Sequence, residues 1–493
     1  MDPLSVHLQQ IESVIQKGPY RDSWQSLAAH KTPAWFTAGK FGIFIHFGVY
    51  SVPAYRGEWY SRNMYDSTSD EYRHHIAHFG AHKDFGYKDF IPMFRAEKFD
   101  ANQWAELFRK AGAKYVMPVA EHHDGFAMYD TAFNRWNAVN MGPKQDIVGA
   151  LKNACAQQGL TFCASTHRAE HYFFMNMGRT IDSDVNDERY ADFYGPAVAR
   201  PDLLGEKQGE ATEDPYSEGP DEAYLQDWMV RTCELIDRYR PKALYFDWWI
   251  QNHAFKPYLK KIAAYYYNRA VEWGEEVVIH YKHEAFAPGT AVFDVERGAL
   301  SGISPVPWQT DTAIGKRSWG FTNDNEFKSA EKIICDLVDI VSKNGNLLLN
   351  VGPRPDGTIT EAETDVLLKI GAWLEKNGEG IYDTTCWRTY GEGETQISGG
   401  YFQDNAELAY TPQDFRFTYK NGVIYAYQMA PNGGDVKIRS LAKQKKRDLL
   451  IRSVRLLGDD AALHFERTEE ALVIPAAPRF RSDTPIGFAI ELL

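Results

Sequence analysis

Short apolar runs alternate with helical patterns between about residues 35 and 385. The runs are rich in β-branched and aromatic residues, which is typical of buried parallel strands. They are Lys40–His46, Lys114–Ala120, Leu160–Ser165, Ala243–Trp248, Val277–Tyr281, Val292–Val295 and Gly345–Val351. Between them, apolar residues recur at helical spacing, as they do behind Asp100, a helix-capping residue type. Strands that alternate with helices predict βαβ units and a parallel sheet.

At least seven such units over about 350 residues favour a closed (β/α) barrel over a doubly wound sheet. From about residue 395 the apolar period changes to two. Phe415–Lys420 and Val423–Gln428 alternate around Asn421-Gly422, a strong hairpin signal. The pattern therefore predicts an α/β fold, a (β/α)8-like TIM barrel with a C-terminal antiparallel β-sandwich.

We expect two domains. Residues 1–390 would form the catalytic barrel, with an N-terminal helical extension, and residues 391–493 the sandwich. A stretch at about 178–222 is acidic and rich in Gly and Pro. It occupies the place of a strand-to-helix loop, so we expect an insertion on the side where barrels build active sites.

Composition excludes several classes of protein. The 493 residues include 54 Lys+Arg and 67 Asp+Glu, a formal net charge of −13. An acidic chain without basic blocks is a poor partner for nucleic acid, and no apolar run approaches the roughly 20 residues of a membrane span. The start lacks a basic segment followed by an apolar one. As written, the chain is expected in the cytoplasm, or in the periplasm or outside the cell if a signal was removed; a homo-oligomer stays open.

Titratable side chains gather where the expected strands end. In chain order these are His46, His122, His123, His167, Glu170, Asp247, His280, Lys282 and Glu296. Barrel active sites lie at the carboxyl ends of the strands, so these side chains should converge.

Two of these residues are carboxylates suited to catalysis. Asp247 ends an apolar strand among large aromatic residues, where a carboxylate is costly to bury unless it is hydrogen-bonded or used. A helix cap or an ion pair is the alternative reading. Glu296 is the second carboxylate, and Asp294 shares its face one layer deeper, so either could be the working acid.

The histidines favour sugar binding over metal binding. Adjacent residues such as His122 and His123 point to opposite faces of a strand, and the usual zinc spacings are absent. A metal-dependent hydrolase built on His46, His122 and His123 stays open as an alternative. Aromatic faces can cover the apolar side of a pyranose while polar groups bind its hydroxyls. A carboxylate pair in such a site predicts a glycoside hydrolase.

Longer motifs narrow the class. In chain order they are Lys40–Pro53, Glu58-Trp59-Tyr60, His122-His-Asp-Gly-Phe126, Asn344–Pro353 and Asp356-Gly-Thr-Ile359. Together they resemble the α-L-fucosidases of glycoside hydrolase family 29, over most of residues 30–385. The resemblance implies a (β/α) barrel with a C-terminal β-sandwich and no metal or organic cofactor. It also implies a retaining exo-glycosidase that acts on terminal α-L-fucosyl residues of oligosaccharides or glycoconjugates.

The resemblance also implies roles for single residues. Asp247 matches the catalytic nucleophile of the family. Tyr245 lies where an aromatic residue lines the sugar, and Trp319 matches an aromatic residue near the C5 methyl group. The remaining expected substrate-binding residues are His46, Glu58, Trp59, His122, His123, His167 and Lys282.

This chain departs from the family pattern in ways that affect the acid/base. Gln309 stands where many members have a glutamate, so we expect Glu296 to be the general acid/base, with Asp294, Glu170 and Glu58 as alternatives. Retention requires the two working carboxyl groups to lie about 5–5.5 Å apart. Lys282 stands roughly where other members have an arginine. A barrel hydrolase for a galactoside-like sugar and an inactive sugar-binding protein are the remaining alternatives.

Overall fold

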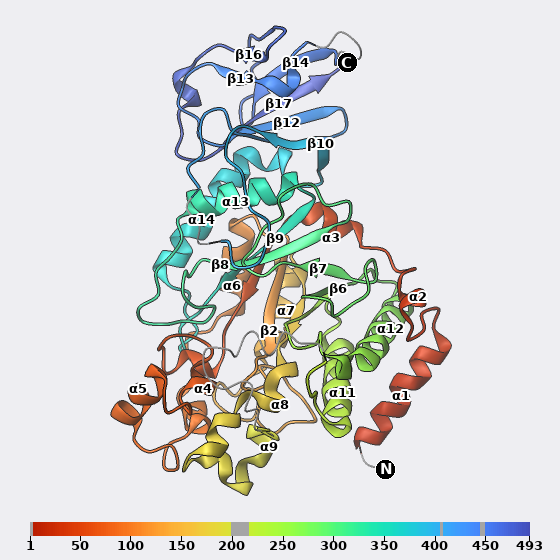
Figure 1. The fold of residues 1–493 in the computed structure, drawn as a ribbon, viewed down its shortest axis with the longest axis vertical. Helices are drawn as coiled ribbons and strands as arrows, with labels where there is room; N and C mark the ends of the chain where they lie inside the picture. The colour runs from red at the N-terminus through yellow and green to blue at the C-terminus, as the bar shows by residue number, and fades with distance from the viewer. Residues whose placement is uncertain (1–2, 199–215, 405–407, 444–448) are drawn as a thin grey trace.

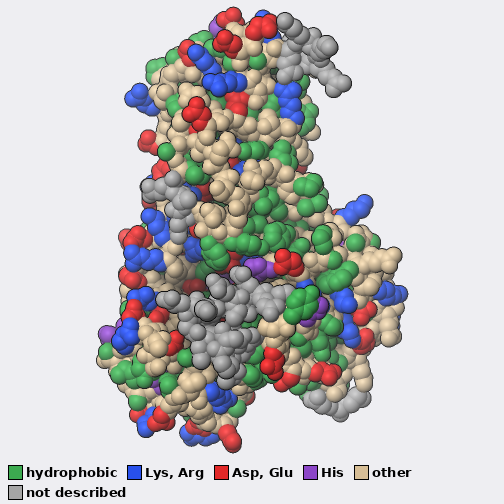
Figure 2. Space-filling view, viewed as in Figure 1, with side chains coloured by type: hydrophobic (Ala, Val, Ile, Leu, Met, Phe, Trp, Pro, Cys, Tyr) green, Lys and Arg blue, Asp and Glu red, His purple; other side chains and the backbone are tan. Residues whose placement is uncertain are grey.

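The structure, a computed structural model, describes residues 3–198, 216–404, 408–443 and 449–493. A barrel of parallel strands occupies the middle of the molecule, and antiparallel sheets are stacked on it along the long axis (Figure 1). This face of the molecule is hollowed near its middle, and hydrophobic side chains gather around the hollow (Figure 2). Among the described residues, no helix has both the length and the apolar character needed to cross a membrane.

The barrel is closed because β1 pairs with both β2 and β9. Its strands are β1 Phe41–Ile45, β2 Tyr115–Glu121, β3 Thr161–Phe162, β4 Ala164–Thr166, β5 Ala243–Phe246, β6 Val278–Tyr281, β7 Val292–Asp294, β8 Trp308–Ala313 and β9 Gly345–Val351. All pairs are parallel, and β3 and β4 share one position beside β2. The described residues therefore form the expected eight-stranded barrel.

Helices pack around the barrel. The long ones are α6 Ala101–Lys110, α7 Ile147–Gln158, α11 Glu222–Tyr239, α12 Lys256–Trp273, α13 Ala330–Ser342 and α14 Glu361–Asn377. The side chain of Asp100 caps α6, as expected, and Asp146 caps α7. The segments that join β6, β7 and β8 contain no helix, although every residue in them is described.

Further helices lie before β1, between β1 and β2, and between β4 and β5. At the N-terminus are α1 Pro3–Lys17, α2 Trp24–Leu27 and α3 Ala34–Gly39; elsewhere are α4 Tyr60–Asn63, α5 Asp70–Phe79, α8 His171–Phe174 and α9 Ala191–Tyr194. The described 3-10 helices are η1 Val49–Ser51, η2 Tyr87–Met93, η3 Arg168–Glu170, η4 Asn176–Thr180, η5 Asp184–Asn186, η6 Glu188–Tyr190, η8 His253–Phe255, η9 Gly378–Gly380, η10 Arg439–Leu441 and η11 Pro478–Phe480. Residues 199–215 of the acidic insertion lie outside the described residues.

The C-terminal part is a pair of antiparallel sheets, as expected. The strands are β10 Thr385–Glu392, β11 Phe415–Lys420, β12 Val423–Gln428, β13 Val436–Ile438, β14 Ile451–Leu456, β15 Glu466–Arg467, β16 Leu472–Ile474 and β17 Ile486–Leu492. The sheet orders are β10-β11-β12-β17-β14 and β13-β16-β15, and apolar side chains of both sheets share one core. The Asn421-Gly422 turn has positive φ at both residues, which suits a tight hairpin.

The sheets rest on α13 and α14, which separate them from the barrel (Figure 1). Arg416 on β11 donates to Asp339 on α13 at 2.5 Å, and Lys343 holds the other oxygen of Asp339 at 2.7 Å. All three side chains are buried. The expected boundary between residues 390 and 391 falls inside β10, the first strand of this part.

Candidate active site

A cavity of about 540 Å³ opens at the end of the barrel where the parallel strands finish. All the expected catalytic and substrate-binding residues except Tyr245 line this cavity, whereas Glu170 and His280 are buried outside its lining. The lining residues are His46, Glu58, Trp59, His122, His123, His167, Asp247, Lys282, Glu296 and Trp319. Most of them come one or two positions after a strand. Because neighbouring strands run parallel, residues one or two positions past each strand end meet around one hollow.

Asp247 follows β5 and lies on the cavity floor. Its Oδ2 contacts His167 Nδ1 at 3.0 Å and His123 Nε2 at 3.2 Å, and its Oδ1 lies 3.2 Å from Lys282 Nζ. Burial raises the pKa of Asp247, but Lys282, His167 and His123 outweigh it and hold the pKa well below its usual range. The carboxylate is therefore ionised at neutral pH.

Lys282, after β6, joins Asp247 to the second carboxylate. Its Nζ lies 2.6 Å from Glu296 Oε2 and 3.3 Å from Asp311 Oδ2. Burial lowers the pKa of Lys282, but Asp311, Glu296 and Asp247 raise it well above its usual value. Burial raises the pKa of Glu296 to about 7 against the effect of Lys282, with Asp311 and Asp247 adding to the rise. One carboxylate is thus fixed as an anion while the other holds a proton near neutrality.

The two histidines on Asp247 differ in charge. His123 donates from Nδ1 to the carbonyl of His167 at 2.7 Å and from Nε2 to Asp247, so both of its nitrogens carry protons. Burial lowers the pKa of His123, but Glu170 and Asp247 raise it above its ordinary value. Burial lowers the pKa of His167, so its ring is neutral. It donates from Nδ1 to Asp247, and its Nε2 therefore accepts from the Ser165 hydroxyl, 2.6 Å away.

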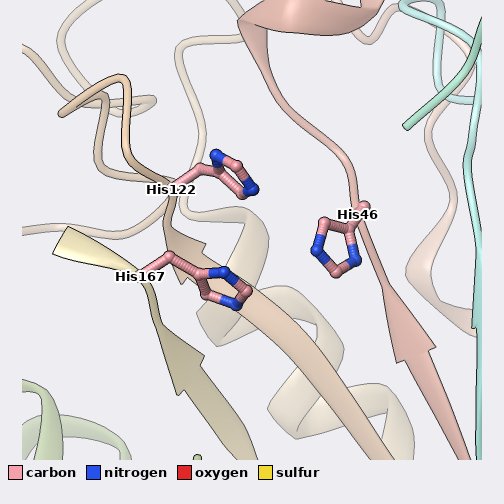
Figure 3. A group of neighbouring side chains, drawn as sticks. All are labelled: His46, His122 and His167. Atoms are coloured by element: carbon pink, nitrogen blue, oxygen red, sulfur yellow. The ribbon is translucent and has the colours of Figure 1, made fainter. Parts of the chain in front are cut away.

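His46, His122 and His167 converge on one side of the cavity (Figure 3). The amide nitrogen of Asn350 donates to a carbonyl, so its Oδ1 accepts from His46 Nδ1 at 2.7 Å. This leaves His46 Nε2 as an acceptor. Burial lowers the pKa of His46 and of His122 well below the usual value, so both rings are neutral.

This trio differs from the metal set considered in the sequence, because His167 takes the place of His123. Atoms of His46, His122 and His167 come within 4.8 Å of one another. Both nitrogens of His167 already have partners in Asp247 and Ser165. A metal ion bound there would have to break one of these contacts. The three histidines are therefore better suited to hydrogen bonds with a sugar than to metal coordination.

The cavity walls are aromatic. Trp59 stacks with Trp248, with ring centroids 6.2 Å apart, and Trp319 stacks on His46 at 5.2 Å. Glu58 lies between these walls, and its Oε2 accepts from Ser318 Oγ at 3.0 Å and from the backbone amides of Trp319 and Gly320 at 3.1 and 3.2 Å. Three donors on one oxygen hold this carboxylate in place.

The other candidate acids lie outside the cavity lining. Asp294 is fully buried, accepts from Gln309 at 2.8 Å, and has a pKa raised well above its usual range by burial and by Asp311. Gln309 is equally buried. Glu170 is 1% exposed and lies behind His123, at 3.5 Å from its Nδ1. Burial raises the pKa of Glu170 to about 7. Among these carboxylates only Glu58 and Glu296 face the cavity.

Tyr245 lies below the cavity rather than in its wall. It is 0% exposed, and its hydroxyl donates to Asp311 Oδ2 at 2.8 Å. Phe44 on β1, whose ring centroid lies 5.2 Å from that of Tyr245, does line the cavity. Further residues that the sequence did not single out as site residues also line the cavity, namely Phe44, Trp248, His283, Arg297, Asp311, Lys316, Arg317, Tyr401, Phe402 and Asp404. Trp248 could have been predicted as a lining residue, because it directly follows Asp247 at the end of a strand.

Fold and site together define a (β/α)-barrel glycoside hydrolase, since two carboxyl groups of unlike protonation face one aromatic-lined cavity. Comparison with known proteins agrees. The family model described as Alpha-L-fucosidase matches residues 7–379. Human plasma alpha-L-fucosidase is 30% identical over 391 residues, covering 76% of this chain and 74% of that protein.

Two further relatives extend the comparison. The alpha-L-fucosidase of Dictyostelium discoideum is 30% identical over 399 residues, or 77% of each chain. The crystal structure of Thermotoga maritima alpha-fucosidase in complex with fucose is 29% identical, with a TM-score of 0.72, and covers 96% of this chain and 100% of that one. The chain belongs to the alpha-L-fucosidase family.

Proposed function

We propose that this protein is a retaining α-L-fucosidase that removes terminal α-L-fucosyl residues from oligosaccharides or glycoconjugates. The observation that carries the proposal is the Asp247–Lys282–Glu296 contact chain on the cavity floor. Family membership supports it. The Thermotoga maritima relative has been solved with fucose and with a mechanism-based inhibitor, which supports a covalent route on this fold.

The spacing of the two carboxyl groups fits retention. Lys282 Nζ lies 3.2 Å from Asp247 Oδ1 and 2.6 Å from Glu296 Oε2. Those two oxygens can therefore be no more than about 6 Å apart, which suits the roughly 5–5.5 Å of retaining enzymes rather than the roughly 6.5–9.5 Å of inverting ones. An inverting enzyme would need room for a water molecule between Asp247 and the sugar.

In the first step, an Asp247 oxygen attacks C1 of the fucoside and forms a glycosyl ester as the glycosidic C1–O bond breaks. Glu296 gives its proton to the departing oxygen. In the second step, Glu296 removes a proton from water, the water oxygen attacks C1, and Asp247 leaves as a carboxylate. The pKa of Glu296, about 7, suits a group that gives and recovers a proton near neutral pH.

The walls supply sugar recognition in this proposal. Neutral His46 and His122 and the fixed carboxylate of Glu58 pair with hydroxyl groups of the fucose ring. The faces of Phe44 and Trp319 cover the C5 methyl group. A galactose-like sugar carries a hydroxymethyl group at this position, and an apolar wall offers its hydroxyl no partner.

The test is nitrophenol release from an aryl α-L-fucoside by the purified protein, beside a panel of other aryl glycosides. We expect turnover of the fucoside, and its loss in Asp247→Ala. The matched control is Asp365→Ala, at an exposed carboxylate of α14. Preference for another glycoside would support a different sugar, and tight fucose binding without turnover would support an inactive sugar-binding protein.

A further inference from the structure

The segment between β10 and β11 returns from the C-terminal sheets to the mouth of the cavity. Residues 399–404, here called the strap, run beside the loop that carries Glu296. Gly400 and Ala299 exchange two backbone hydrogen bonds of 2.9 and 3.1 Å, and the amide of Phe402 donates to the carbonyl of Glu296 at 3.0 Å. The strap thus pairs with the main chain of Glu296 itself.

The two segments approach so closely that a glycine is required. A Cβ atom at Gly298 would lie 2.3 Å from the carbonyl oxygen of Gly400, a distance that real structures do not show. Gly400 has a φ of +140°, which favours glycine as well. The close packing of the strap against the loop after β7 therefore depends on glycine at positions 298 and 400.

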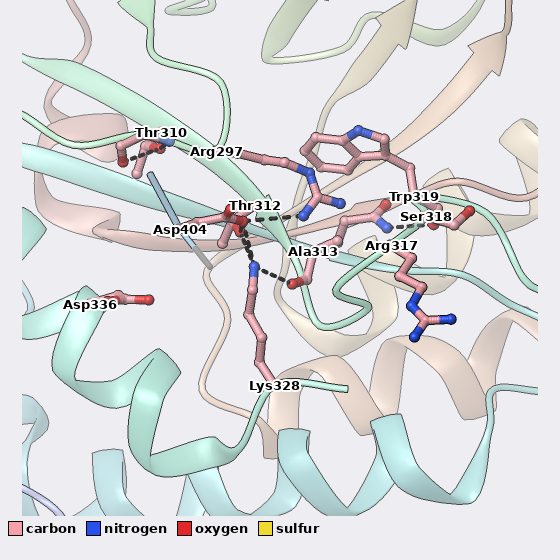
Figure 4. Close-up of polar contacts among 12 residues, drawn as sticks. Arg297, Thr310, Thr312, Ala313, Arg317, Ser318, Trp319, Lys328, Asp336 and Asp404 are labelled. Atoms are coloured by element: carbon pink, nitrogen blue, oxygen red, sulfur yellow. Dashed lines mark hydrogen bonds and ion pairs between the residues drawn. The ribbon is translucent and has the colours of Figure 1, made fainter. Parts of the chain in front are cut away.

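A buried cluster of charges fixes the end of the strap. Asp404 accepts hydrogen bonds from Lys328 and Thr312 and lies 3.2 Å from Arg297 Nη1 (Figure 4). Lys328 and Asp404 are 3% and 7% exposed. The Arg297 guanidinium also lies over the Trp319 ring, 4.5 Å from its centroid. The anchor of the strap is thus continuous with the cavity wall.

Two aromatic residues of the strap, Tyr401 and Phe402, line the cavity. Packing within the protein does not explain why Phe402 is exposed. Tyr401 stacks on His283, with centroids 5.1 Å apart. Phe402 is 66% exposed and has a φ of +54°. An exposed phenylalanine in the left-handed region costs free energy twice, in backbone strain and in apolar surface left in water. A ligand that covers the ring would offset that cost.

We propose that Tyr401 and Phe402 form the subsite for the leaving group, with the Phe402 ring stacked on the sugar to which fucose is attached. This inference rests on the proposed function. Glu296 must sit at the departing oxygen to protonate it, so the residues beside Glu296 at the cavity mouth face the group that departs. An aromatic face covers the apolar side of a pyranose.

The test compares kcat/KM for a fucosylated oligosaccharide with kcat/KM for α-L-fucosyl fluoride, whose leaving group is a single atom. We expect the ratio of the two to fall about 3- to 10-fold in Phe402→Ala. Phe402→Tyr, which keeps the ring, should restore the ratio. Leu450→Ala, at an exposed apolar residue of the sandwich, is the matched control and should keep the wild-type ratio.

An unchanged ratio in Phe402→Ala would overturn the inference and leave the proposed function standing. If the wild-type protein turns over neither substrate, the proposed function fails and the inference fails with it. If the alanine variant does not fold, Phe402→Gly gives the same comparison, because glycine adopts a φ of +54° without strain.

Discussion

Replacing Lys282 by methionine would remove the positive charge that Asp247, Glu296 and Asp311 share. Methionine has a similar length and no charge, so the packing changes less than the electrostatics. The Lys282 ammonium lies 2.6 Å from Glu296 and 3.2 Å from Asp247, and its side chain is 2% exposed. Water cannot easily replace the buried ammonium group, so the pKa values of both carboxyl groups should change when the charge is removed.

The size of the effect follows from these distances. An opposite charge within about 4–6 Å lowers the pKa of a carboxyl group by about 1–3 units. Without Lys282, the pKa of Glu296 should therefore rise from about 7 by about 1–3 units. A general acid works only while protonated, so activity is lost as the pH rises through this pKa. The alkaline limb of kcat/KM, expected near pH 7 in the wild type, should move up by the same amount.

The assay is the pH profile of kcat/KM on an aryl α-L-fucoside, with melting temperatures recorded at each pH to confirm that the variant is folded. The maximum of the profile should also fall, because Glu296 becomes a weaker acid by about 1.4 kcal/mol per unit of pKa. Lys282→Arg keeps the charge and should leave the limb near its wild-type position. An alkaline limb that stays near pH 7 in Lys282→Met would refute the reasoning, since the group that titrates would then not be next to Lys282.

Three other outcomes are expected. Glu296→Ala should lower turnover of a fucoside with a poor leaving group by about 10²–10⁴-fold, and azide should restore activity on a fucoside with an activated one; no rescue would assign the acid to another carboxylate. Dialysis against a chelator should leave turnover intact because both nitrogens of His167 are engaged, and a loss that zinc reverses would contradict this. Arg416→Met should lower the free energy of unfolding by about 1–3 kcal/mol because one buried oxygen of Asp339 loses its donor while Lys343 still holds the other; denaturant melts with an unchanged midpoint would speak against it.

The positions at strand ends were predictable because they depend on local information. An apolar run shows where a strand stops, and in a closed parallel barrel every stop faces the same cavity. His46, His123 and Asp247 could therefore be placed from their neighbours in sequence alone. The same holds for the Asn421-Gly422 hairpin, whose register depends on its two turn residues.

Depth within the barrel was not predictable. The alternation along β5 correctly puts Tyr245 on the same inward side as Asp247, but it does not tell which layer meets the cavity. Similarly, β8 was not recognised as a strand, since its inward positions Gln309 and Asp311 are polar. Prediction of a strand from its hydrophobic pattern fails where the inward side chains of that strand are polar because they belong to the active site. Such failures therefore point to functional positions.

The strap has no local signature either, because backbone hydrogen bonds across a hundred residues leave no pattern in sequence. Its place nevertheless follows from the position of the acid. Gln309 on β8 cannot donate and recover a proton, so in the proposed mechanism Glu296 on the loop after β7 takes that role. A loop holds a side chain less firmly than a strand does, and the amide of Phe402 bonds the main chain at Glu296. The C-terminal sheets, which extend this strap, would thus help to position the acid as well as to bind the leaving group.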